Sequence, residues 1–230
     1  MRWRVLTWNV RGSAKPDLER LAAVIGEQRP DVVALQEIRR SQARLLARAL
    51  GWQQTWTRKH YPYTPMLWWL AEGLAVMSPH AIEHPASRSL TPGLSTWTYR
   101  HRVVLAATVR RDGASVRVYD THLAAHHHPD ARIQQAERVA AMINDDRLPA
   151  IVAGDLNAHG EQEVVRAFHA AGLRDPGGAS THPSIAPRSR LDYVLVPERA
   201  QLIDDHVPDG GEEWAVLSDH LPLAVEVELA

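Results

Sequence analysis

The first fifty positions contain stretches with the apolar spacing of strands and stretches with the apolar spacing of helices, one after the other. The run from Trp3 to Val10 alternates and is rich in β-forming residues, which predicts a strand. A nearly continuous apolar run over residues 31–38 is typical of a strand that is buried on both faces. Between these runs, apolar positions on one face predict a helix that begins at Pro16 and Asp17 and ends at Pro30.

The middle of the chain is rich in strand patterns, and helix and strand patterns alternate after it. A helix is predicted over residues 41–50, with Ser41 as its N-cap and Gly51 as its end. A turn at Asp112 and Gly113 predicts a hairpin within residues 102–123. The other expected elements are strands at 52–57, 66–71, 73–78, 150–157, 191–196 and 221–229, helices at 130–146 and 161–173, and a long surface loop over 79–101.

These elements predict a single α/β domain over residues 1–230, because no repeat, low-complexity tract or flexible linker divides the chain. The chain lacks cysteine, which excludes disulfides and thiolate metal sites. No apolar run is long enough for a signal peptide or a membrane span, so we expect a cytoplasmic monomer. The net charge of −1 provides no global attraction for nucleic acid, although it is compatible with a local basic patch.

Side chains that can bind a cation or move a proton recur where the predicted strands begin or end. One such residue is commonly a cap or a turn residue, but a recurrence along the whole chain favours a shared site beyond the strand ends. Asp155 and Asn157, two residues apart on a predicted strand, would face one spot together. The full set is Asn9, Glu37, Asp120, His122, Asp155, Asn157, Asp192, Asp219 and His220.

This set of residue types suits phosphoryl transfer assisted by a hard cation. Glu37 and Asn9 would offer few protein ligands, which Mg²⁺ prefers because it keeps waters and takes substrate oxygens; Mn²⁺ is the alternative. Asp155 would orient or deprotonate the attacking water. Asp192 would fix the tautomer of His220 and raise its pKa.

Short motifs in a fixed order carry a family resemblance. They are TWNVRG, LQEI, EGLAVMS, DTHL, GDLNA, RLDYVL and SDHLP. Each motif is weak alone, but the ordered set, which extends from Asn9 to Pro222, resembles the endonuclease/exonuclease/phosphatase superfamily. That group includes pancreatic deoxyribonuclease, abasic-site endonucleases, neutral sphingomyelinases and inositol polyphosphate phosphatases. The resemblance implies a four-layer sandwich of two packed β-sheets flanked by helices, and a metal-dependent phosphodiesterase or phosphatase.

The resemblance also implies a role for each matching residue around the metal and the water. Asn9 and Glu37 would hold the main Mg²⁺, with Asp219 close by. Asp155 would position or activate the water, and Asn157 would bind a phosphate oxygen or the nucleophile.

On the phosphate itself, the resemblance implies that Asp192 orients His220, which contacts the scissile phosphate. His122 would be the second histidine of the phosphate site, near the leaving group. Glu72 matches a position that orients this histidine in some members of the superfamily.

Some further residues have a functional interpretation and a structural alternative. His126 to His128 could bind a metal, line a rim that touches substrate, or lie in a solvated loop. Arg11, Arg100 and Arg102 could point into the site or carry solvated charge. Aromatic side chains beside Arg58, Lys59 and His60 could stack on bases or pack in the core; they are Trp52, Trp56, Tyr61, Tyr63, Trp68 and Trp69.

The sequence defines the class of reaction better than the substrate. Arginines near the motifs and the aromatic and basic segment favour a nuclease that acts on DNA or RNA, whereas the near-zero net charge and small size oppose it. The alternative is a phosphodiesterase or phosphatase of a small-molecule or lipid phosphoester. A catalytically silent binding protein is disfavoured because every expected polar position is filled.

Overall fold

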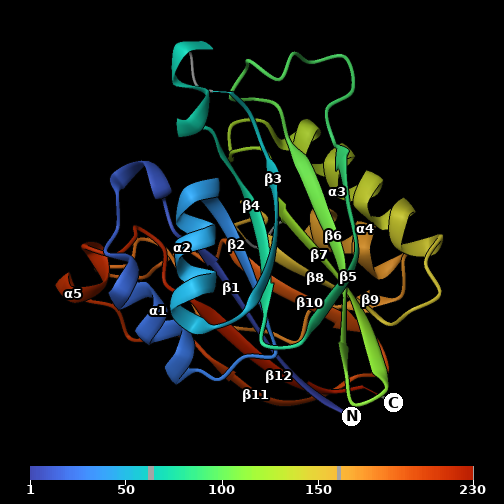
Figure 1. The fold of residues 1–230 in the computed structure, drawn as a ribbon. Coiled ribbons are helices and arrows are strands. Elements are labelled where there is room, and N and C mark those ends of the chain that lie inside the picture. The colour runs from blue at the N-terminus through green and yellow to red at the C-terminus, as the bar shows by residue number, and fades with distance from the viewer. Residues whose placement is uncertain (62–64, 160–161, 230) are drawn as a thin grey trace.

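The computed structural model describes residues 1–61, 65–159 and 162–229, which form two β-sheets packed face to face (Figure 1). In spatial order, the first sheet consists of β11 (Gln201–His206), β12 (Leu223–Glu228), β1 (Arg2–Asn9), β2 (Val32–Arg39), β4 (Glu72–Ser78) and β3 (Gln53–Arg58). The second sheet consists of β5 (Ala81–Ser89), β6 (Val103–Arg111), β7 (Ala114–His122), β8 (Ala150–Asp155), β10 (Asp192–Pro197) and β9 (Leu173–Arg174).

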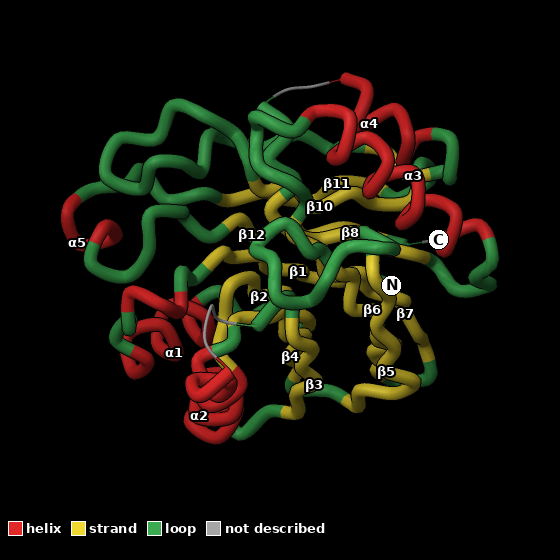
Figure 2. The backbone as a smooth tube through the Cα atoms, turned by 90° about the horizontal axis from the view of Figure 1, so that it is seen from above, coloured by secondary structure: helices red, strands yellow, loops and turns green. Residues whose placement is uncertain are grey.

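Helices cover the outer face of each sheet, as Figure 2 shows from above. Helices α1 (Leu18–Glu27) and α2 (Arg40–Leu50) lie on the first sheet, and α3 (Pro129–Asn144) and α4 (Gln162–His169) lie on the second. The short elements are α5 (Glu212–Ala215) and two 3₁₀ helices, η1 (Gly12–Ala14) and η2 (Pro65–Leu70). The predicted four-layer α/β sandwich is confirmed. Among the described residues, no helix has the length and apolar character needed to cross a membrane.

The alternation along β1 shows how the sequence builds the layers. Trp3 and Val5 point into the core between the sheets, whereas Leu6 and Trp8 point to the core under α1 and α2. Each large apolar side chain buried in this way stabilises the fold by roughly 1.5–3 kcal/mol. Asn9 continues the inward-facing set, and the alternation therefore delivers its carboxamide to the end of the gap between the sheets.

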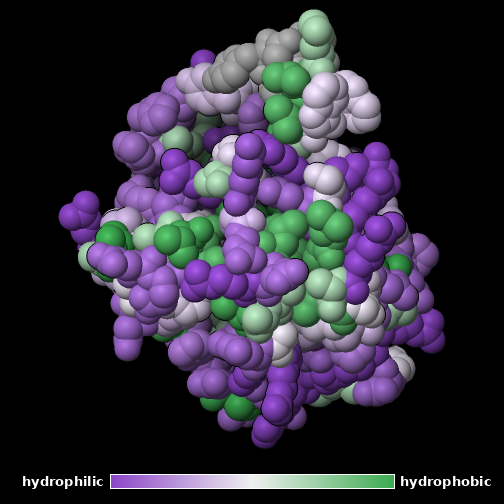
Figure 3. Space-filling model, turned by 60° about the vertical axis from the view of Figure 1, so that its left-hand side comes forward, coloured by the Kyte–Doolittle hydropathy of each residue, from purple (hydrophilic) through white to green (hydrophobic). Residues whose placement is uncertain are grey.

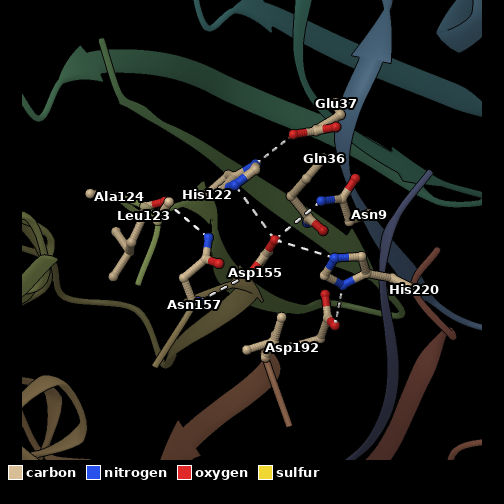
Figure 4. Close-up of polar contacts among 12 residues, drawn as sticks. Asn9, Gln36, Glu37, His122, Leu123, Ala124, Asp155, Asn157, Asp192 and His220 are labelled. Atoms are coloured by element: carbon tan, nitrogen blue, oxygen red, sulfur yellow. Dashed lines mark hydrogen bonds and ion pairs between the residues drawn. The ribbon is translucent and has the colours of Figure 1, made fainter. Parts of the chain in front are cut away.

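Strand register places the predicted site residues in rows. In the second sheet, His122 on β7 is paired with Asp155 on β8, and Asp155 is paired with Asp192 on β10. In the first sheet, Asn9 on β1 is paired with Gln36 on β2. Because both rows lie at the same end of the sandwich, residues from five strands meet at one mouth (Figure 4).

Gly154 allows β7 and β8 to approach closely just below the site. Its φ of +154° is one that L side chains rarely adopt, and a Cβ built there would lie 1.9 Å from the carbonyl oxygen of Thr121. Only glycine permits this contact, so the residue fixes the spacing between His122 and Asp155.

A β-bulge aims Glu37 out of the regular strand pattern. The strand does not end at Glu37 as predicted; it continues to Arg39, and the register with β4 shifts between Gln36 and Ile38. Glu37 itself has a left-handed φ of 56°. Bulges redirect side chains next to active sites, and this one turns the carboxylate toward the mouth.

Two element predictions were wrong. Residues 66–71 do not form a strand; most of them form the 3₁₀ helix η2, because Met66, Trp68 and Trp69 project into solvent and gain no burial from pairing. The expected loop 79–101 begins with the edge strand β5, which the sequence hides because its side chains are mostly exposed and a bulge accommodates Pro85.

Two local expectations also need correction. Ser41 does not cap α2, because the helix already begins at Arg40, and the Gln42 side chain accepts the Arg39 N–H at 2.9 Å instead. Strand β8 ends at Asp155, so Asn157 lies beyond it with a left-handed φ of 50°. Strand alternation therefore does not explain how Asp155 and Asn157 reach the same place.

Candidate active site

Asp155 lies at the centre of the mouth between the two sheets. Its Oδ2 atom accepts a hydrogen bond from Asn9 Nδ2 at 3.1 Å and lies 3.5 Å from His122 Nε2 and 3.9 Å from His220 Nε2 (Figure 4). The side chain is 2% exposed. Burial raises the pKa of Asp155 to about 6, and the Asp192 charge adds to this shift while His220 and the Asn9 amide oppose it. A carboxyl with such a pKa can accept a proton near neutral pH.

Asp192 holds His220 in one orientation. The Oδ2 atom of Asp192 lies 2.8 Å from His220 Nδ1 and accepts a second hydrogen bond from the Thr181 hydroxyl at 2.6 Å. Burial would lower the pKa of His220, but the Asp192 carboxylate and its hydrogen bond, together with Asp155, raise it to about 10. His220 is therefore an imidazolium at neutral pH, as the sequence predicted for a histidine beside a buried acid.

The pKa of the second histidine, His122, is shifted in the other direction. His122 is buried, with Nδ1 3.6 Å from Glu37 Oε1 and Nε2 facing Asp155. Burial, followed by the nearby positive charges of Lys59 and Arg102, lowers the pKa of His122 well below its usual range. The two environments thus shift the pKa values of His122 and His220 in opposite directions, which is a common arrangement in acid–base sites.

Asn157 reaches the site through a turn. Its backbone N–H donates to Asp155 Oδ1 at 3.0 Å, which is the local contact typical of an Asx turn, and its side-chain Nδ2 donates to the Leu123 carbonyl at 3.3 Å. Asn157 is therefore both a turn residue and a residue of the site.

Glu37 and Asn9 have the chemistry of a hard-cation site. Burial alone would raise the pKa of Glu37, but the charges of Lys59, His220 and Arg102 outweigh it and lower the pKa, so that the carboxylate is ionised. Its contacts with Lys59 and His122 both involve Oε1. An ionised carboxylate with a neighbouring carboxamide fits the small protein contribution that Mg²⁺ requires.

Asp155, Asp192 and His220 form a second group that could hold a metal ion. One ligand atom from each lies within 4.8 Å of the others. Asp192 Oδ2 accepts a hydrogen bond from Thr181 and lies against His220 Nδ1, whereas Asp192 Oδ1 has no hydrogen-bond partner among the described residues. The mouth therefore contains two donor sets that could hold a cation, this group and the pair of Glu37 and Asn9.

Asp219 lies beside Asn9, although no contact joins the two side chains among the described residues. The Ser218 hydroxyl lies 2.6 Å from the Asn9 carbonyl oxygen and 3.5 Å from Asp219 Oδ1. Arg11 Nη1 pairs with Asp219 Oδ2 at 3.3 Å on the exposed side. Arg11 thus contacts an acid of the site edge rather than the mouth itself.

The outer wall of the site contains residues whose contacts sequence reasoning did not predict. Lys59 is 4% exposed, and its Nζ lies 3.4 Å from Glu37 Oε1; burial lowers the pKa of Lys59 and Glu37 opposes this shift. Arg102 is also buried, so its charge is not a solvated one. In the sequence, Lys59 stands out only as one of several basic residues. Its contact with Glu37 depends on where β3 ends relative to β2, which the sequence does not show.

Glu72 and Asp120 lie near the site but have local partners. Glu72 Oε1 accepts the Ser13 N–H at 3.0 Å, whereas the acids that pair with His122 among the described residues are Glu37 and Asp155. Asp120 is fully buried and accepts a hydrogen bond from Gln36 Nε2 at 2.8 Å. Burial raises the pKa of Asp120 well above its usual range, and its hydrogen bond with Gln36 joins the two sheets.

The histidine run and the aromatic segment lie around the mouth. The rings of His126, His127 and His128 contact one another, and His126 also contacts His159, but no metal-binding group forms among them within the described ranges. The aromatic residues of the segment differ in their surroundings. Trp52 and Trp56 pack against the core, Trp68 and Trp69 are exposed, Tyr61 stacks on Trp97, and Tyr63 lies outside the described residues.

The chain belongs to the endonuclease/exonuclease/phosphatase family, whose model matches residues 6–220. Members of this family hydrolyse phosphoesters and generally depend on a divalent metal. No match was found among curated proteins.

Solved structures show the same fold over the whole chain. An endonuclease/exonuclease/phosphatase from Bacteroides vulgatus has a TM-score of 0.83 at 19% identity, with 100% of both chains covered. The mannosyl-6-phosphatase Bt3783 of Bacteroides thetaiotaomicron has a TM-score of 0.80 at 19% identity, covering 99% of this chain and 100% of that one. The human Nocturnin catalytic domain, with a bound sulfate anion, has a TM-score of 0.75 at 22% identity, covering 100% and 95%.

Proposed function

We propose that this protein is a metal-dependent phosphodiesterase that hydrolyses nucleic-acid strands by attack of water on phosphorus. The observation that carries the proposal is the placement of Asp155 Oδ2 between His122 at 3.5 Å and the Asp192-bound His220 at 3.9 Å. A base, a fixed positive charge and a neutral histidine thus converge on one point of the mouth.

In this proposal the side chains act in concert on one phosphate. The Asp155 carboxylate accepts a proton from the attacking water as the new O–P bond forms and the P–O bond to the leaving group breaks. The His220 imidazolium offers its Nε2–H to a phosphate oxygen that gains charge, while the Asn157 amide orients the phosphate or the nucleophile. His122 and Arg102 lie on the leaving-group side.

A divalent cation bound by Glu37 and Asn9 would polarise the phosphate and stabilise its developing charge. Mg²⁺ suits this donor set, and Mn²⁺ is the alternative. Asp219, one residue before His220, would lie at the edge of the cation site, where Arg11 holds it.

A basic and aromatic crest beside the mouth supports nucleic acid as the substrate. We define the basic crest as residues 58–61, 65–70 and 90–102, a region whose sequence contains no Asp or Glu. It includes the cations Arg58, Lys59, Arg100 and Arg102. The Arg58 guanidinium lies 3.6 Å from the ring centre of Tyr61. Exposed aromatic faces beside cations can stack on bases and hold phosphates.

The crest is joined to the catalytic residues and rises above the sheets in Figure 1. Tyr61 N–H donates to the Thr96 carbonyl at 2.8 Å, and Arg102 Nε donates to the Leu123 carbonyl at 3.1 Å, one residue after His122. Figure 3 shows apolar residues at the top of the molecule, where this crest lies. A strand bound there would pass directly over the mouth.

The alternative substrate class is a small or lipid phosphoester. The fold similarity to a mannosyl-6-phosphatase favours this alternative, since a sugar phosphate requires no crest. Both alternatives use the same catalytic residues and differ only in what lies beyond the scissile phosphate.

One experiment tests the reaction and the substrate class together. Plasmid DNA, short single strands of DNA and RNA, and bis-p-nitrophenyl phosphate are incubated with Mg²⁺, Mn²⁺ or EDTA, using wild type and Asp155→Ala. We expect metal-dependent cleavage of strands that falls by at least about a hundredfold in the variant. Near-wild-type turnover by Asp155→Ala would remove Asp155 from its role. Cleavage of the small diester alone would favour the alternative substrate class.

A further inference from the structure

Lys59 is a buried cation whose backbone is fixed from both sides. It follows β3, and its N–H donates to the Glu72 carbonyl at 2.9 Å. Its own carbonyl lies 2.6 Å from His101 Nδ1. This anchoring turns the side chain inward to Glu37, so that Lys59 reaches the site although its neighbours belong to the basic crest.

The contact with Glu37 uses little of the binding capacity of Lys59. An ammonium group has three N–H donors, and within the described residues Nζ makes one hydrogen bond, to Glu37 Oε1 at 3.4 Å. Charge-assisted hydrogen bonds are commonly near 2.7–2.9 Å. Lysine is rarely buried without close partners, because desolvating its charge is costly. The remaining donors are therefore available to an anion that enters the mouth.

Arg102 is a second buried cation on the same wall. It is 7% exposed, and it donates to the carbonyl oxygens of Leu123 at 3.1 Å and Tyr99 at 2.8 Å. These neutral partners fix the direction of the guanidinium but do not neutralise its charge. No Asp or Glu occurs between Glu83 and Asp112 along its own segment.

The charges of Lys59 and Arg102 would be left without full compensation in the metal-bound site. Lys59 faces Glu37 and lies near Glu72, whereas the hydrogen bonds of Arg102 within the described residues go to carbonyl oxygens. A divalent cation at Glu37 would take up the charge of that carboxylate. A phosphate beside the scissile one would then supply negative charge to these two cations.

Lys59 contacts Glu37, whereas Asp155 contacts His122. The contacts run from Lys59 to Glu37 Oε1, from the same oxygen to His122 Nδ1, and from His122 Nε2 to Asp155. If the scissile phosphate lies at Asp155, the His122 ring and the Glu37 oxygen stand between it and the Lys59 ammonium along these contacts. Lys59 is therefore placed for a neighbouring phosphate rather than for the reacting one.

We propose that Lys59 and Arg102 form a second anion subsite, which binds a phosphate next to the scissile one and selects substrates with two adjacent phosphates. A nucleic-acid strand and an ester of pyrophosphate both present this chemistry. The inference rests on the proposed function, because it describes the same mouth.

The test compares substrates that differ by one phosphate. Steady-state kcat and KM are measured for a thymidine dinucleotide, with one phosphate, and for the trinucleotide, with two. Lys59→Met should raise KM for the trinucleotide at least about tenfold more than KM for the dinucleotide, while kcat changes equally for both. Lys59→Arg should restore most of the loss. Lys15→Met, which alters the other lysine of the chain on the exposed end of η1, should change neither KM.

Binding of inorganic anions provides an arm that requires no turnover. In EDTA, calorimetry should show that wild type binds pyrophosphate more tightly than phosphate and that Lys59→Met loses this preference. Lys59→Gln carries the same expectation should the Met variant fail to fold. If wild type cleaves neither strand, the proposed function fails, and the pyrophosphate preference alone decides the subsite.

Two results would overturn the inference. Equal losses on the dinucleotide and the trinucleotide would mean that Lys59 acts through Glu37 and not on a second phosphate. Wild type that does not prefer pyrophosphate to phosphate would show that the wall has no second anion subsite.

Discussion

The surroundings of the two site histidines shift their pKa values in opposite directions, and this contrast defines the site at the scale of residues. His220 has a carboxylate 2.8 Å from Nδ1 and is held as an imidazolium. His122 is buried beside Lys59 and Arg102 and is held neutral. The consequence is a polarity across the mouth, with a fixed positive charge on one side of Asp155 and a neutral ring on the other.

The charge of His220 should appear in the pH dependence of stability. Its folded-state pKa of about 10 lies above the ordinary value near 6.5, so its contribution is fully present below about pH 6.5 and is lost as pH rises through 10. The stability advantage of wild type over His220→Gln should fall by up to about 1.4 kcal/mol per pH unit in that window. Urea unfolding from pH 6 to 10 in EDTA, followed by tryptophan fluorescence, measures it.

His206 supplies the control variant, because its side chain is exposed at the end of β11. His206→Gln should change the free energy of unfolding by no more than about 0.5 kcal/mol at each pH tested. A difference for His220→Gln that stays constant from pH 6 to 10 would show that His220 is not charged in the folded protein.

Glu37 should determine metal affinity separately from turnover. Because its carboxylate is the charged member of the proposed ligand pair, Glu37→Gln should weaken Mn²⁺ binding by at least about tenfold, measured by calorimetry without substrate. Glu198→Gln, at an exposed position after β10, provides a matched control. An unchanged metal titration for Glu37→Gln would remove Glu37 from the metal site.

At the scale of elements, strand spacing holds the catalytic groups together. The closest backbone approach below the site is that of Gly154 to the Thr121 carbonyl. Gly154→Ala should therefore lower the free energy of unfolding by at least about 3 kcal/mol and reduce turnover, because the added Cβ must push β7 from β8. Chemical denaturation and the bis-p-nitrophenyl phosphate assay measure both effects.

Gly113→Ala is the control that distinguishes the effect of steric crowding from the effect of backbone strain. It has a φ of +82° in the β6–β7 turn, but a Cβ there would meet nothing within 4 Å. Gly113→Ala should thus cost only the left-handed penalty of about 1–2 kcal/mol and leave turnover intact. Equal effects of the two substitutions would contradict the role assigned to the contact with Thr121.

The elements that could be predicted are those whose local pattern and tertiary environment agree. The buried runs of β1, β2 and β8 are apolar because both faces are covered, so their sequences identified them and the polar residues near their ends. Strand β5 is a polar edge, and η2 is apolar but exposed, so in both cases the pattern and the burial disagree.

Agreement between local pattern and tertiary environment also distinguishes the site residues that could be predicted from those that could not. Asp155, His122 and Asp192 are neighbours through regular strand register, which motif positions on strands already imply. The bulge at Glu37 and the contact of Lys59 with it depend on how β2, β3 and β4 are paired. No local pattern reports such pairing, and Lys59 looked like one more member of a basic segment.

For the molecule as a whole, positive charge is local and not global. The net charge is −1, yet the basic crest contains no acidic residue. Binding of a single strand should therefore be salt-dependent, but only to the extent of the crest's cations. With up to four phosphate contacts, log K should fall against log salt concentration with a slope between about −2 and −3. Fluorescence anisotropy of a labelled strand in EDTA measures it.

Substitutions of arginines inside and outside the basic crest test whether the crest is responsible for this slope. The double variant Arg58→Ala/Arg100→Ala should reduce the slope by about 1.4. Arg44→Ala/Arg48→Ala, on the exposed face of α2, should leave it unchanged. Equal effects of both pairs would indicate that the strand binds to diffuse surface charge and not to the crest.

The pairing of β1 with β12 joins segments that are far apart in the sequence, with Arg2 opposite Glu228. Trp8 and Ser218, which hold His220 and Asn9 in place, belong to the same junction. The site is therefore among the parts of the molecule that form last as the chain emerges from the ribosome. A growing chain would carry most of the catalytic residues without their alignment, and would stay inert toward phosphoesters until this junction has formed.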